Sequence, residues 1–596
     1  MKRQSGLPLL MLVALVMTSL TFITPISVAS AQIRSSRLPK RDYYAAFGEY
    51  YQGDYKDAQR QFRSAFNSAF RVGNNRFVDS VCILTMLGEC HYQVGDYAGA
   101  MDLYNQSAEL YLTFAGRRWQ NDIQLPRTIP ADTSAVQKAR VTWGTPKRRG
   151  RIANIPSTIS VLRGQNDAPR ILIGDSILDT SEIRQVDVTE VMRCVALMIR
   201  RRGSILGPSA KFDPVTIRLA AKLKRTGMGN GSYLGSLNGI VYGCITSALG
   251  QKDKAVDLLT RSLQISGGLD HPLTSLGLIE LAEIELLKEN STKATALATE
   301  ASFTAAYFDQ YDRIEEALSI GTQGHLLTQR SLFLPLRNAV VWAGRENADK
   351  MQAALSVRIA ECLSESGDAV GSGNVLKEVN RLLSRRNSLG KTIIASRARY
   401  LTALNSFLSG NNQQGLKQLQ GAISHLGTRS KLQYRLRTAD TVNSQGGLTE
   451  KQADALYTLT LQDPADLQWK LDPMEAIAFL LTPHVDAMQR WFTVVVNRKR
   501  NVQALEIADA IRRHRFYSTL PMGGRLLSLR WVMHGDVTLL SQNALQQRQK
   551  FMARYHEYRK LRDDAAAVRA KLEDLEVFPG KDSPDLRLEK NMFPNW

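Results

Sequence analysis

The sequence predicts an all-α protein in which antiparallel helix pairs stack into an α-solenoid, with a small β-containing or loop insertion and a C-terminal helical region. One phrase is written twice, as GDYKDAQRQF over residues 53–62 and as GDYAGAMDLY over residues 95–104. Helix pairs with glycine or alanine at their turns then recur about every 40 residues as far as residue 440. At 596 residues the chain is too long for a single core, which favours repeated units.

Residues 1–31 predict a secretory signal peptide. Lys2 and Arg3 precede an uncharged apolar run over residues 7–23, and Ala-Ser-Ala at residues 29–31 is a typical cleavage site. The alternative is an uncleaved anchor, since about 17 apolar residues is the lower limit for crossing a bilayer. We therefore expect a bacterial protein exported to the periplasm or the medium, attached to a membrane only if this segment is retained.

The composition is that of a folded chain, with 44% hydrophobic and 22% charged residues. Lys and Arg number 77 against 56 Asp and Glu, and the net charge of +21 favours an acidic partner. Basic runs such as RRR at residues 200–202 lack interleaved aromatic residues, so we interpret them as solvated helix faces; together with export, this argues against nucleic acid. The five cysteines include no C-x-x-C pair, which predicts free buried thiols.

The stretch LTMLGECHYQV over residues 84–94 predicts the first helix of a pair. Its apolar face is formed by Leu84, Leu87, Gly88 and His91, which recur at i, i+3, i+4 and i+7. A turn at residues 95–96 leads into the second helix. Two helices can cross closely only at small residues, and Gly88 on the first helix and Ala100 on the second supply them.

This pair resembles a tetratricopeptide repeat (TPR). The family pattern of a large apolar residue, a small one, a turn glycine, an alanine and an aromatic is matched by Leu87, Gly88, Gly95, Ala100 and Tyr104. The earlier copy matches it through Ala46, Gly53, Ala58, Phe62 and Ala65, but has Glu49 where the family usually has an aromatic. Residues 32–116 are therefore expected to form an N-terminal TPR pair, with RVGNNRFVD at residues 71–79 lengthening the connection.

Residues 183–440 are predicted to continue as a degenerate TPR-like array. The small residues persist while the turn phrase decays, at Gly243 and Gly250, Ala282 and Ala294, Ala360 and Gly367, and Ala403 and Gly410. Because one pair cannot bury its own face, the copies are expected to stack. The alternative is an irregular helical bundle, above all over residues 300–400.

Residues 117–182 are predicted to be an insertion. Five prolines break the helical period, and VTWGT at residues 141–145, TISVLRG at 158–164 and RILIG at 170–174 read as short strands or extended segments. Trp143 and the basic run at residues 147–151 make the insertion a candidate contact surface. Packing over the edge of the array is the alternative.

Residues 441–596 are predicted to be a C-terminal helical region, with a linker at residues 463–473 and a long helix from about residue 545 to about 575. Within it, ALEIADAIRRHRFYSTL over residues 504–520 resembles the segment that precedes CHAT (caspase-like) protease domains. The CHAT domain itself is expected to be absent.

No residue pattern commits the chain to catalysis. Cys90 and His91 are neighbours on a helix, so their side chains point about 100° apart and cannot form a dyad. Asp270 and His271 are interpreted as part of a turn between helices. The chain contains neither H-x-x-x-H nor C-x-x-C, so we predict no metal, no cofactor and no enzymatic activity.

The predicted function is therefore that of a non-catalytic scaffold that binds a protein or peptide through a concave surface. The TPR resemblance implies that ligand-facing positions lie on the first helix of each pair, here Tyr43, Phe47, Tyr50, Thr85, Glu89 and Tyr92. Packing between repeats is the alternative role of the tyrosines. Two other functions stay open: a regulatory or vestigial partner of a CHAT-type protease, and an enzyme with a site between the insertion and the solenoid. The sequence does not indicate an oligomeric state.

Overall fold

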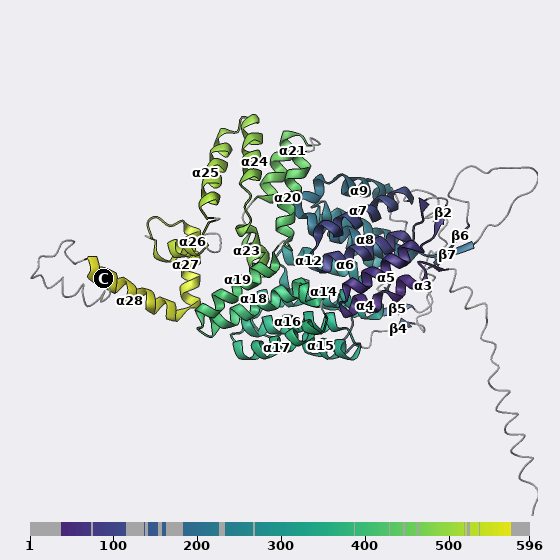
Figure 1. The fold of residues 1–596 in the computed structure, drawn as a ribbon, viewed down its shortest axis with the longest axis horizontal. Helices are drawn as coiled ribbons and strands as arrows, with labels where there is room; N and C mark the ends of the chain where they lie inside the picture. The colour runs from purple at the N-terminus through teal and green to yellow at the C-terminus, as the bar shows by residue number, and fades with distance from the viewer. Residues whose placement is uncertain are drawn as a thin grey trace, which may run out of the picture. The chain divides into compact units, whose positions relative to one another are not determined.

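The protein is all-α, as the sequence predicts, and the computed structural model is dominated by helices with a few short strands (Figure 1). It describes residues 37–72, 75–114, 136–137, 141–148, 150–152, 158–162, 183–225, 233–265, 269–386, 388–427, 429–444, 448–461, 464–517, 519–520, 525–535 and 537–573. The chain divides into two compact units, the first ending at Ile511 and the second beginning at Arg512. The predicted signal peptide lies outside the described residues.

Helices in the first half of the chain follow the predicted pairs. The N-terminal helices are α3 (Arg41–Ala45), α4 (Phe47–Gln52), α5 (Tyr55–Asn67), α6 (Ser80–Gln93) and α7 (Tyr97–Phe114). After the insertion come α8 (Val188–Leu206), the 3-10 helix η2 (Gly207–Phe212), α9 (Pro214–Arg225), α10 (Tyr233–Ala248), α11 (Lys252–Ile265), α12 (Thr274–Leu287) and α13 (Ser291–Tyr307). Consecutive helices pack on each other, as α6 does on α7 and α10 on α11.

The second half continues in the same manner. Its helices are α14 (Tyr311–Thr328), α15 (Pro335–Arg345), α16 (Asp349–Glu365), α17 (Ala369–Arg385), the 3-10 helix η3 (Leu389–Lys391), α18 (Ile393–Leu408), α19 (Asn412–Leu426), α20 (Lys431–Ser444), α21 (Glu450–Thr460), α22 (Asp466–Leu471), α23 (Pro473–Leu481), α24 (Val485–Asn497) and α25 (Asn501–Tyr517). The predicted linker at residues 463–473 thus contains a helix, α22. Among the described residues, none of the helices has both the length and the apolar character that a bilayer crossing needs.

One turn geometry joins the helices of many pairs. A residue with positive φ ends the first helix, and the next residue donates its N–H to the carbonyl five positions earlier, as Asp96 does to His91 at 3.0 Å and Asn290 to Glu285 at 2.9 Å. This is a Schellman-type C-cap, for which glycine is preferred. The positive-φ residue of these turns is Gly53, Gly95, Gly250, Gly367 or Gly410, but also Glu289, Asp309, Asn347 or Lys499. The same turn geometry therefore occurs at positions where the sequence no longer contains the Gly-Asp phrase.

Exchanging residues at these turns is expected to change stability in opposite directions. Glu289 is exposed and has a φ of 62°, so Glu289→Gly removes backbone strain and should raise the free energy of unfolding by about 1 kcal/mol. Gly250 has a φ of 82° and open space around it, so Gly250→Ala adds only strain and should cost about 1 kcal/mol. Urea unfolding checks both; two shifts in the same direction would contradict this account.

The close helix crossing predicted at Gly88 is confirmed. A Cβ atom on Gly88 would lie 2.5 Å from the ring of Tyr104, so the glycine admits the aromatic side chain of the second helix. Gly243 admits Leu259 in the same way, at 2.6 Å, and each covering residue lies sixteen positions after its glycine. The two pairs therefore share one register across their turns.

Gly88→Ala is expected to destabilise the protein although alanine is the better helix former. Tyr104 is fully buried and cannot move aside, so overpacking should cost about 1–3 kcal/mol. The matched control is Gly373→Ala in α17, where no atom lies within 4 Å of the added Cβ and the gain should be up to about 1 kcal/mol. Thermal unfolding of both variants distinguishes packing from propensity, because propensity alone would stabilise both.

The insertion supplies short strands. They are β4 (Val136–Gln137), β5 (Gly150–Ile152) and β6 (Thr158–Leu162), joined in sheets by β1 (Arg37–Leu38), β7 (Ile183–Asp187) and β8 (Leu269–Asp270), while β2 (Arg71–Val72) and β3 (Asn75–Arg76) form a separate hairpin. The sheets have the orders β1-β7-β6 and β4-β5-β8, with β6 antiparallel and β1 parallel to β7. The expected strand at residues 158–164 is confirmed over Thr158–Leu162, and the segment at 170–174 lies outside the described residues.

Residues 141–145, expected to be a short strand or an extended segment, do not form a strand. This segment has no regular structure, because Trp143 anchors it on the helices: the indole Nε1 donates to Ser302 Oγ at 3.0 Å, and the ring meets Trp342 edge-on at 5.4 Å. Trp143 is 5% exposed. It packs over the helical array rather than offering a contact surface, which was the alternative.

The second unit contains α26 (Arg525–His534), α27 (Gln542–Arg554) and α28 (His556–Glu573). The single long helix expected from about residue 545 is wrong, since it is divided at Tyr555, where φ and ψ are −120° and 83°. That residue ends α27, and α28 begins immediately after it.

Candidate functional site

The six residues predicted to face a ligand lie in the interior of the first unit. Tyr43, Tyr50, Thr85, Glu89 and Tyr92 are buried, and Phe47 is half-buried. Tyr50 donates its hydroxyl to Glu89 Oε2 at 3.3 Å, Thr85 Oγ1 lies 2.9 Å from Ser107 Oγ, and Lys431 Nζ donates to the Tyr92 hydroxyl at 2.7 Å. In this conformation, all of these polar groups are engaged within the chain.

Helices that follow much later in the chain cover these positions. Helix α4 contacts α16, and in Figure 1 the purple N-terminal helices lie beside the teal ones. The rings of Tyr51 and Tyr311 are 4.9 Å apart, and Arg386 Nη2 donates to Gln52 Oε1 at 2.8 Å. A face that is exposed in an isolated repeat is thereby buried by residues about 260 to 330 positions later.

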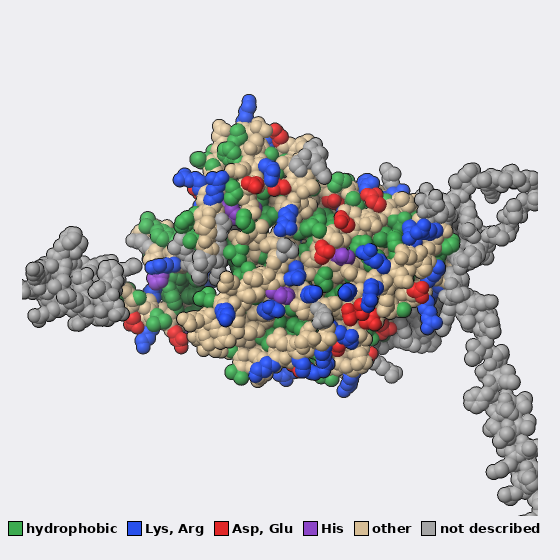
Figure 2. Space-filling model, viewed as in Figure 1, with side chains coloured by type: hydrophobic (Ala, Val, Ile, Leu, Met, Phe, Trp, Pro, Cys, Tyr) green, Lys and Arg blue, Asp and Glu red, His purple; other side chains and the backbone are tan. Residues whose placement is uncertain are grey.

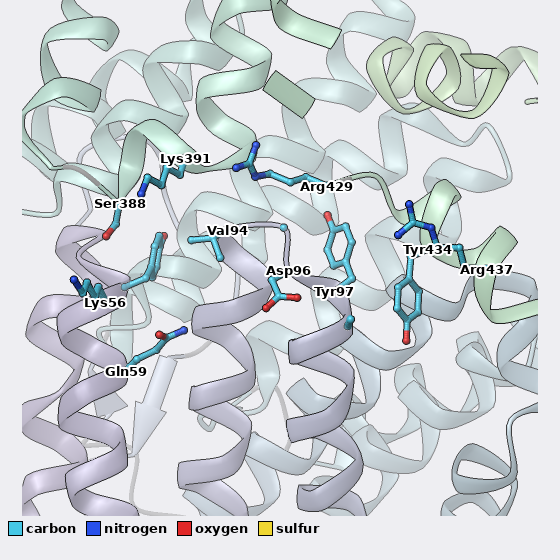
Figure 3. Close-up of a pocket in the computed structure, with 13 residues that line it drawn as sticks. Lys56, Gln59, Val94, Asp96, Tyr97, Ser388, Lys391, Arg429, Tyr434 and Arg437 are labelled. Atoms are coloured by element: carbon cyan, nitrogen blue, oxygen red, sulfur yellow. The ribbon is translucent and has the colours of Figure 1, made fainter. Parts of the chain in front are cut away.

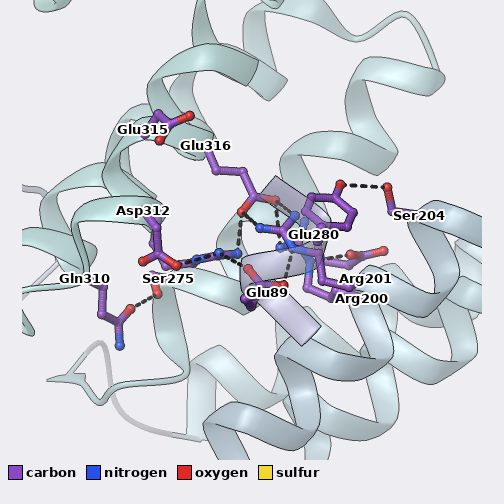
Figure 4. A network of polar contacts seen from close by, with 12 residues as sticks. Glu89, Arg200, Arg201, Ser204, Ser275, Glu280, Gln310, Asp312, Glu315 and Glu316 are labelled. Carbon is purple, nitrogen blue, oxygen red and sulfur yellow. Dashed lines mark hydrogen bonds and ion pairs between the residues drawn. The ribbon is translucent and has the colours of Figure 1, made fainter. Parts of the chain in front are cut away.

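A network of buried ion pairs occupies this interior (Figure 4). We call it the interior network; its members are Glu89 of α6, Arg200 and Arg201 of α8, Glu280 and Glu283 of α12, and Asp312, Arg313 and Glu316 of α14. Arg200 binds three carboxylates: its Nε lies 2.8 Å from Glu280, its Nη2 2.9 Å from Glu283 and its Nη1 3.0 Å from Glu316.

Glu89 connects the N-terminal pair to the rest of this network. One oxygen accepts from Arg201 Nε at 3.0 Å and from the Tyr104 hydroxyl at 2.6 Å; the other accepts from Arg313 Nη2 at 3.3 Å. Glu89 and Arg313 are completely buried. Buried charges are tolerated only when they are paired and hydrogen-bonded. These three partners of Glu89 come from three different helices, α7, α8 and α14.

The interpretation of RRR at residues 200–202 as a solvated face is therefore wrong. All three arginines are at most 7% exposed, because α8 is surrounded by other helices on all sides. Successive side chains on a helix point about 100° apart, so the three reach different partners. Arg202 binds Asp213 and Asn105. Elsewhere on the face drawn in Figure 2, Lys and Arg are spread over the first unit without forming one patch.

The arginines hold the network carboxylates in their charged form. Burial alone would raise the pKa of Asp312, but the charge and hydrogen bond of Arg313 outweigh it and lower that pKa to about 2. Burial opposes ionisation of Glu316 too, yet Arg201, Arg313 and Arg200 hold its pKa well below the usual range. At neutral pH the network is therefore fully ionised at these two residues.

The histidine and the cysteines singled out in the sequence are structural. His271 is buried between β8 and α12, with Nε2 3.0 Å from Ser236 Oγ, and burial lowers its pKa to about 3. All five cysteines are buried free thiols, and burial raises the pKa of Cys82 and Cys90 well above that of an exposed thiol. Such thiols are poor nucleophiles at neutral pH.

A cavity of about 720 Å³ opens beside the interior network. Arg200, Glu280 and Glu283 form one part of its lining, and Lys431 and Arg435 of α20 form another. Lys431 also donates to Ser204 Oγ at 2.8 Å, and Arg435 donates to the carbonyl groups of Ser204 and Ile205. These bonds fix α20 against the end of α8.

The second unit contains a groove of about 880 Å³ between its own helices. Its apolar lining comes from Met533, Val537, Leu545, Met552, Ala565, Ala566 and Ala570. Arg530, Arg548, Arg559 and Arg562 also line it, against the single carboxylate of Asp563. The lining of the groove thus combines apolar side chains with an excess of positive charge. No sequence motif marks it, because its residues come from three separate helices.

Over the described ranges, no group of three or more His, Cys, Asp or Glu side chains is arranged to hold a metal ion. Comparison with known proteins found no matching family model and no curated protein of significantly similar sequence.

Proposed function

We propose that this chain is an exported, non-catalytic scaffold in which TPR-like helix pairs form an α-solenoid that carries a binding surface for a protein partner. The recurrent Schellman-type turn and the shared crossing of Gly88 and Gly243 support the repeat architecture. On this proposal, the interior network holds the curvature of the array. The six residues predicted to bind a ligand then stabilise the interior of the first unit, and the partner binds at a different surface.

Exposed apolar side chains in the second unit are the observation that most favours a binding partner. Large hydrophobic residues at least 42% exposed there are Phe516, Leu529, Trp531, Val537, Leu539, Tyr555, Leu561 and Val568. Those buried in the same unit, among the residues described, are Met533, Leu540 and Met552. The described part of this unit exposes more large apolar side chains than it buries. Exposed apolar surface of this kind is typical of a binding site for another molecule.

The groove of the second unit favours an acidic amphipathic helix as its occupant. The apolar residues of its lining suit the apolar face of a helix, and its four arginines suit carboxylates flanking that face. Arg548 and Arg562 have partners within the unit, Gly535 and Asp563, whereas no carboxylate pairs with Arg530 or Arg559 in the part of the chain that is described. This agrees with the acidic partner that the net charge favours.

Binding of a designed helical peptide tests this function. The probe is a fluorescein-labelled helix of about 20 residues with Leu on one face and Glu on the other; its control carries Lys in place of Glu. Fluorescence anisotropy with the full chain should show binding of the Glu peptide and much weaker binding of the Lys peptide. Val537→Asp, in the groove, should weaken binding of the Glu peptide at least about tenfold.

The matched control for this variant is Val370→Asp in α17, which changes a 76% exposed valine on the first unit. It should leave binding unchanged. Equal binding of the Glu and Lys peptides would contradict the charge complementarity, and equal loss in both variants would assign binding to another surface.

A further inference from the structure

A pocket of about 620 Å³ lies where the two repeated phrases meet later helices of the first unit (Figure 3). We call it the turn pocket. Its lining includes the starts of α5 and α7, at Tyr55 and Tyr97, and residues from the segments around η3 and α20. The approach is close, since a Cβ atom on Gly95 would lie 2.6 Å from the Cβ of Arg429.

Positive charge dominates the turn pocket. Lys56, Lys391, Arg429 and Arg437 line it, against one carboxylate, Asp96. Asp96 is already engaged, with Oδ2 2.7 Å from His91 Nδ1 and Oδ1 accepting from the Gly99 N–H at 3.0 Å. Within the described ranges no carboxylate lies within ion-pair distance of the four cations; Arg429 bonds to the carbonyl of His425. The lining therefore carries a net charge of +3, from four cations and one carboxylate.

Backbone groups reinforce this charge. Tyr55 and Lys56 at the start of α5 line the pocket, and the N-terminal turn of a helix presents free N–H groups and a partial positive charge, whereas Asp96 already caps the start of α7. Asp54 precedes α5 but makes no capping hydrogen bond with its side chain. The start of α5 is thus open to an external acceptor.

Two buried tyrosines form part of the lining. Tyr55 and Tyr97 are 1% and 2% exposed, and their hydroxyl oxygens are closed off from solvent and have no hydrogen-bond partner among the described residues. In Figure 3, Tyr97 points from the start of α7 toward the segment that carries Arg429. The tyrosines therefore help to form the wall of the pocket, and the charged side chains supply the contacts to a ligand.

From the charge, the volume and the uncapped start of α5 we infer that the turn pocket binds a small polyanion that carries phosphate or carboxylate groups. Its volume exceeds that of a single such group, so several anionic groups on one molecule can contact the cations at once. The turn pocket belongs to the first unit and the groove of the proposed function to the second, so the inference does not depend on that proposal.

Isothermal titration calorimetry of the full chain tests the inference, with inorganic tripolyphosphate and citrate as separate probes. The variant is Lys391→Gln with Arg437→Gln, two exposed residues of the pocket; the control is Lys417→Gln with Lys451→Gln, which removes the same charge elsewhere. At low salt we expect at least one probe to bind, with affinity reduced about tenfold or more in the pocket variant and unchanged in the control. The better probe identifies phosphate or carboxylate as the preferred group.

Three results would overturn the inference. If neither probe binds, this ligand class is excluded. If both variants weaken binding equally, the binding depends on the overall charge of the protein and not on the turn pocket. Binding of a Glu-rich peptide but of neither small anion would assign the pocket to an acidic protein segment. Thermal unfolding at unchanged midpoints in both variants shows that a loss of binding does not reflect misfolding.

Discussion

Replacing Glu89 with leucine is expected to lower the free energy of unfolding of the first unit by about 3–5 kcal/mol. Glu89 accepts from Arg201, Arg313, Tyr50 and Tyr104, so its loss leaves two buried guanidinium groups short of negative charge. The size of the effect comes from the uncompensated charges rather than from the lost bonds alone. Urea unfolding followed by circular dichroism measures it.

Two further variants separate this explanation from simple loss of packing. Glu378→Leu removes a carboxylate that pairs with Arg381 on the surface and should cost less than about 1 kcal/mol. Adding Arg201→Met to Glu89→Leu removes one of the stranded charges and should recover part of the loss. If the double variant is less stable than the sum of the single effects, the electrostatic account is wrong.

Acidification is expected to remove several kcal/mol of stability between about pH 4.5 and about pH 2. Burial would raise the pKa of Asp312 and Glu361, but Arg313 for the first, and Arg397 and Arg358 for the second, lower both values to about 2. A carboxyl group with a lower pKa in the folded state stabilises that state fully above its unfolded pKa, near 4. This stabilisation is lost as the pH falls through the folded pKa.

Unfolding in urea at about pH 5, 4 and 3 measures this slope. Glu361→Gln should flatten it, since one titrating group is removed. Asp79→Asn provides a control of opposite sign: burial raises the pKa of Asp79 to about 6, so this group costs stability as the pH rises from about 4 to about 6. An Asp79→Asn variant with the same flattening as Glu361→Gln would contradict the assignment.

Local features of the helix pairs could be predicted from the sequence. The apolar spacing around Leu84 and Gly88, the turn at Gly95 and the close crossing at Gly88 all depend on residues fewer than about 20 positions apart, and all appear in the structure. The residue that Gly88 admits is Tyr104, whereas the sequence pointed to Ala100. The turns at Glu289, Asp309 and Asn347 carry no signature in the sequence, because the geometry tolerates residues other than glycine. The break at Tyr555 carries none either, because no proline or glycine lies there.

The sequence by itself determined the helices, their pairing and the small residues at which they cross, because these depend on side-chain periodicity and backbone preference over one or two turns. Only the tertiary structure decided what those helices face. Tyr50 and Glu89 are buried by Asp312 and Arg313, more than 200 residues later, and Arg200–Arg202 became interior cations because α8 is enclosed by other helices. A residue's own neighbours define which face of a helix is apolar, but the packing of helices that are distant in the sequence decides what covers that face.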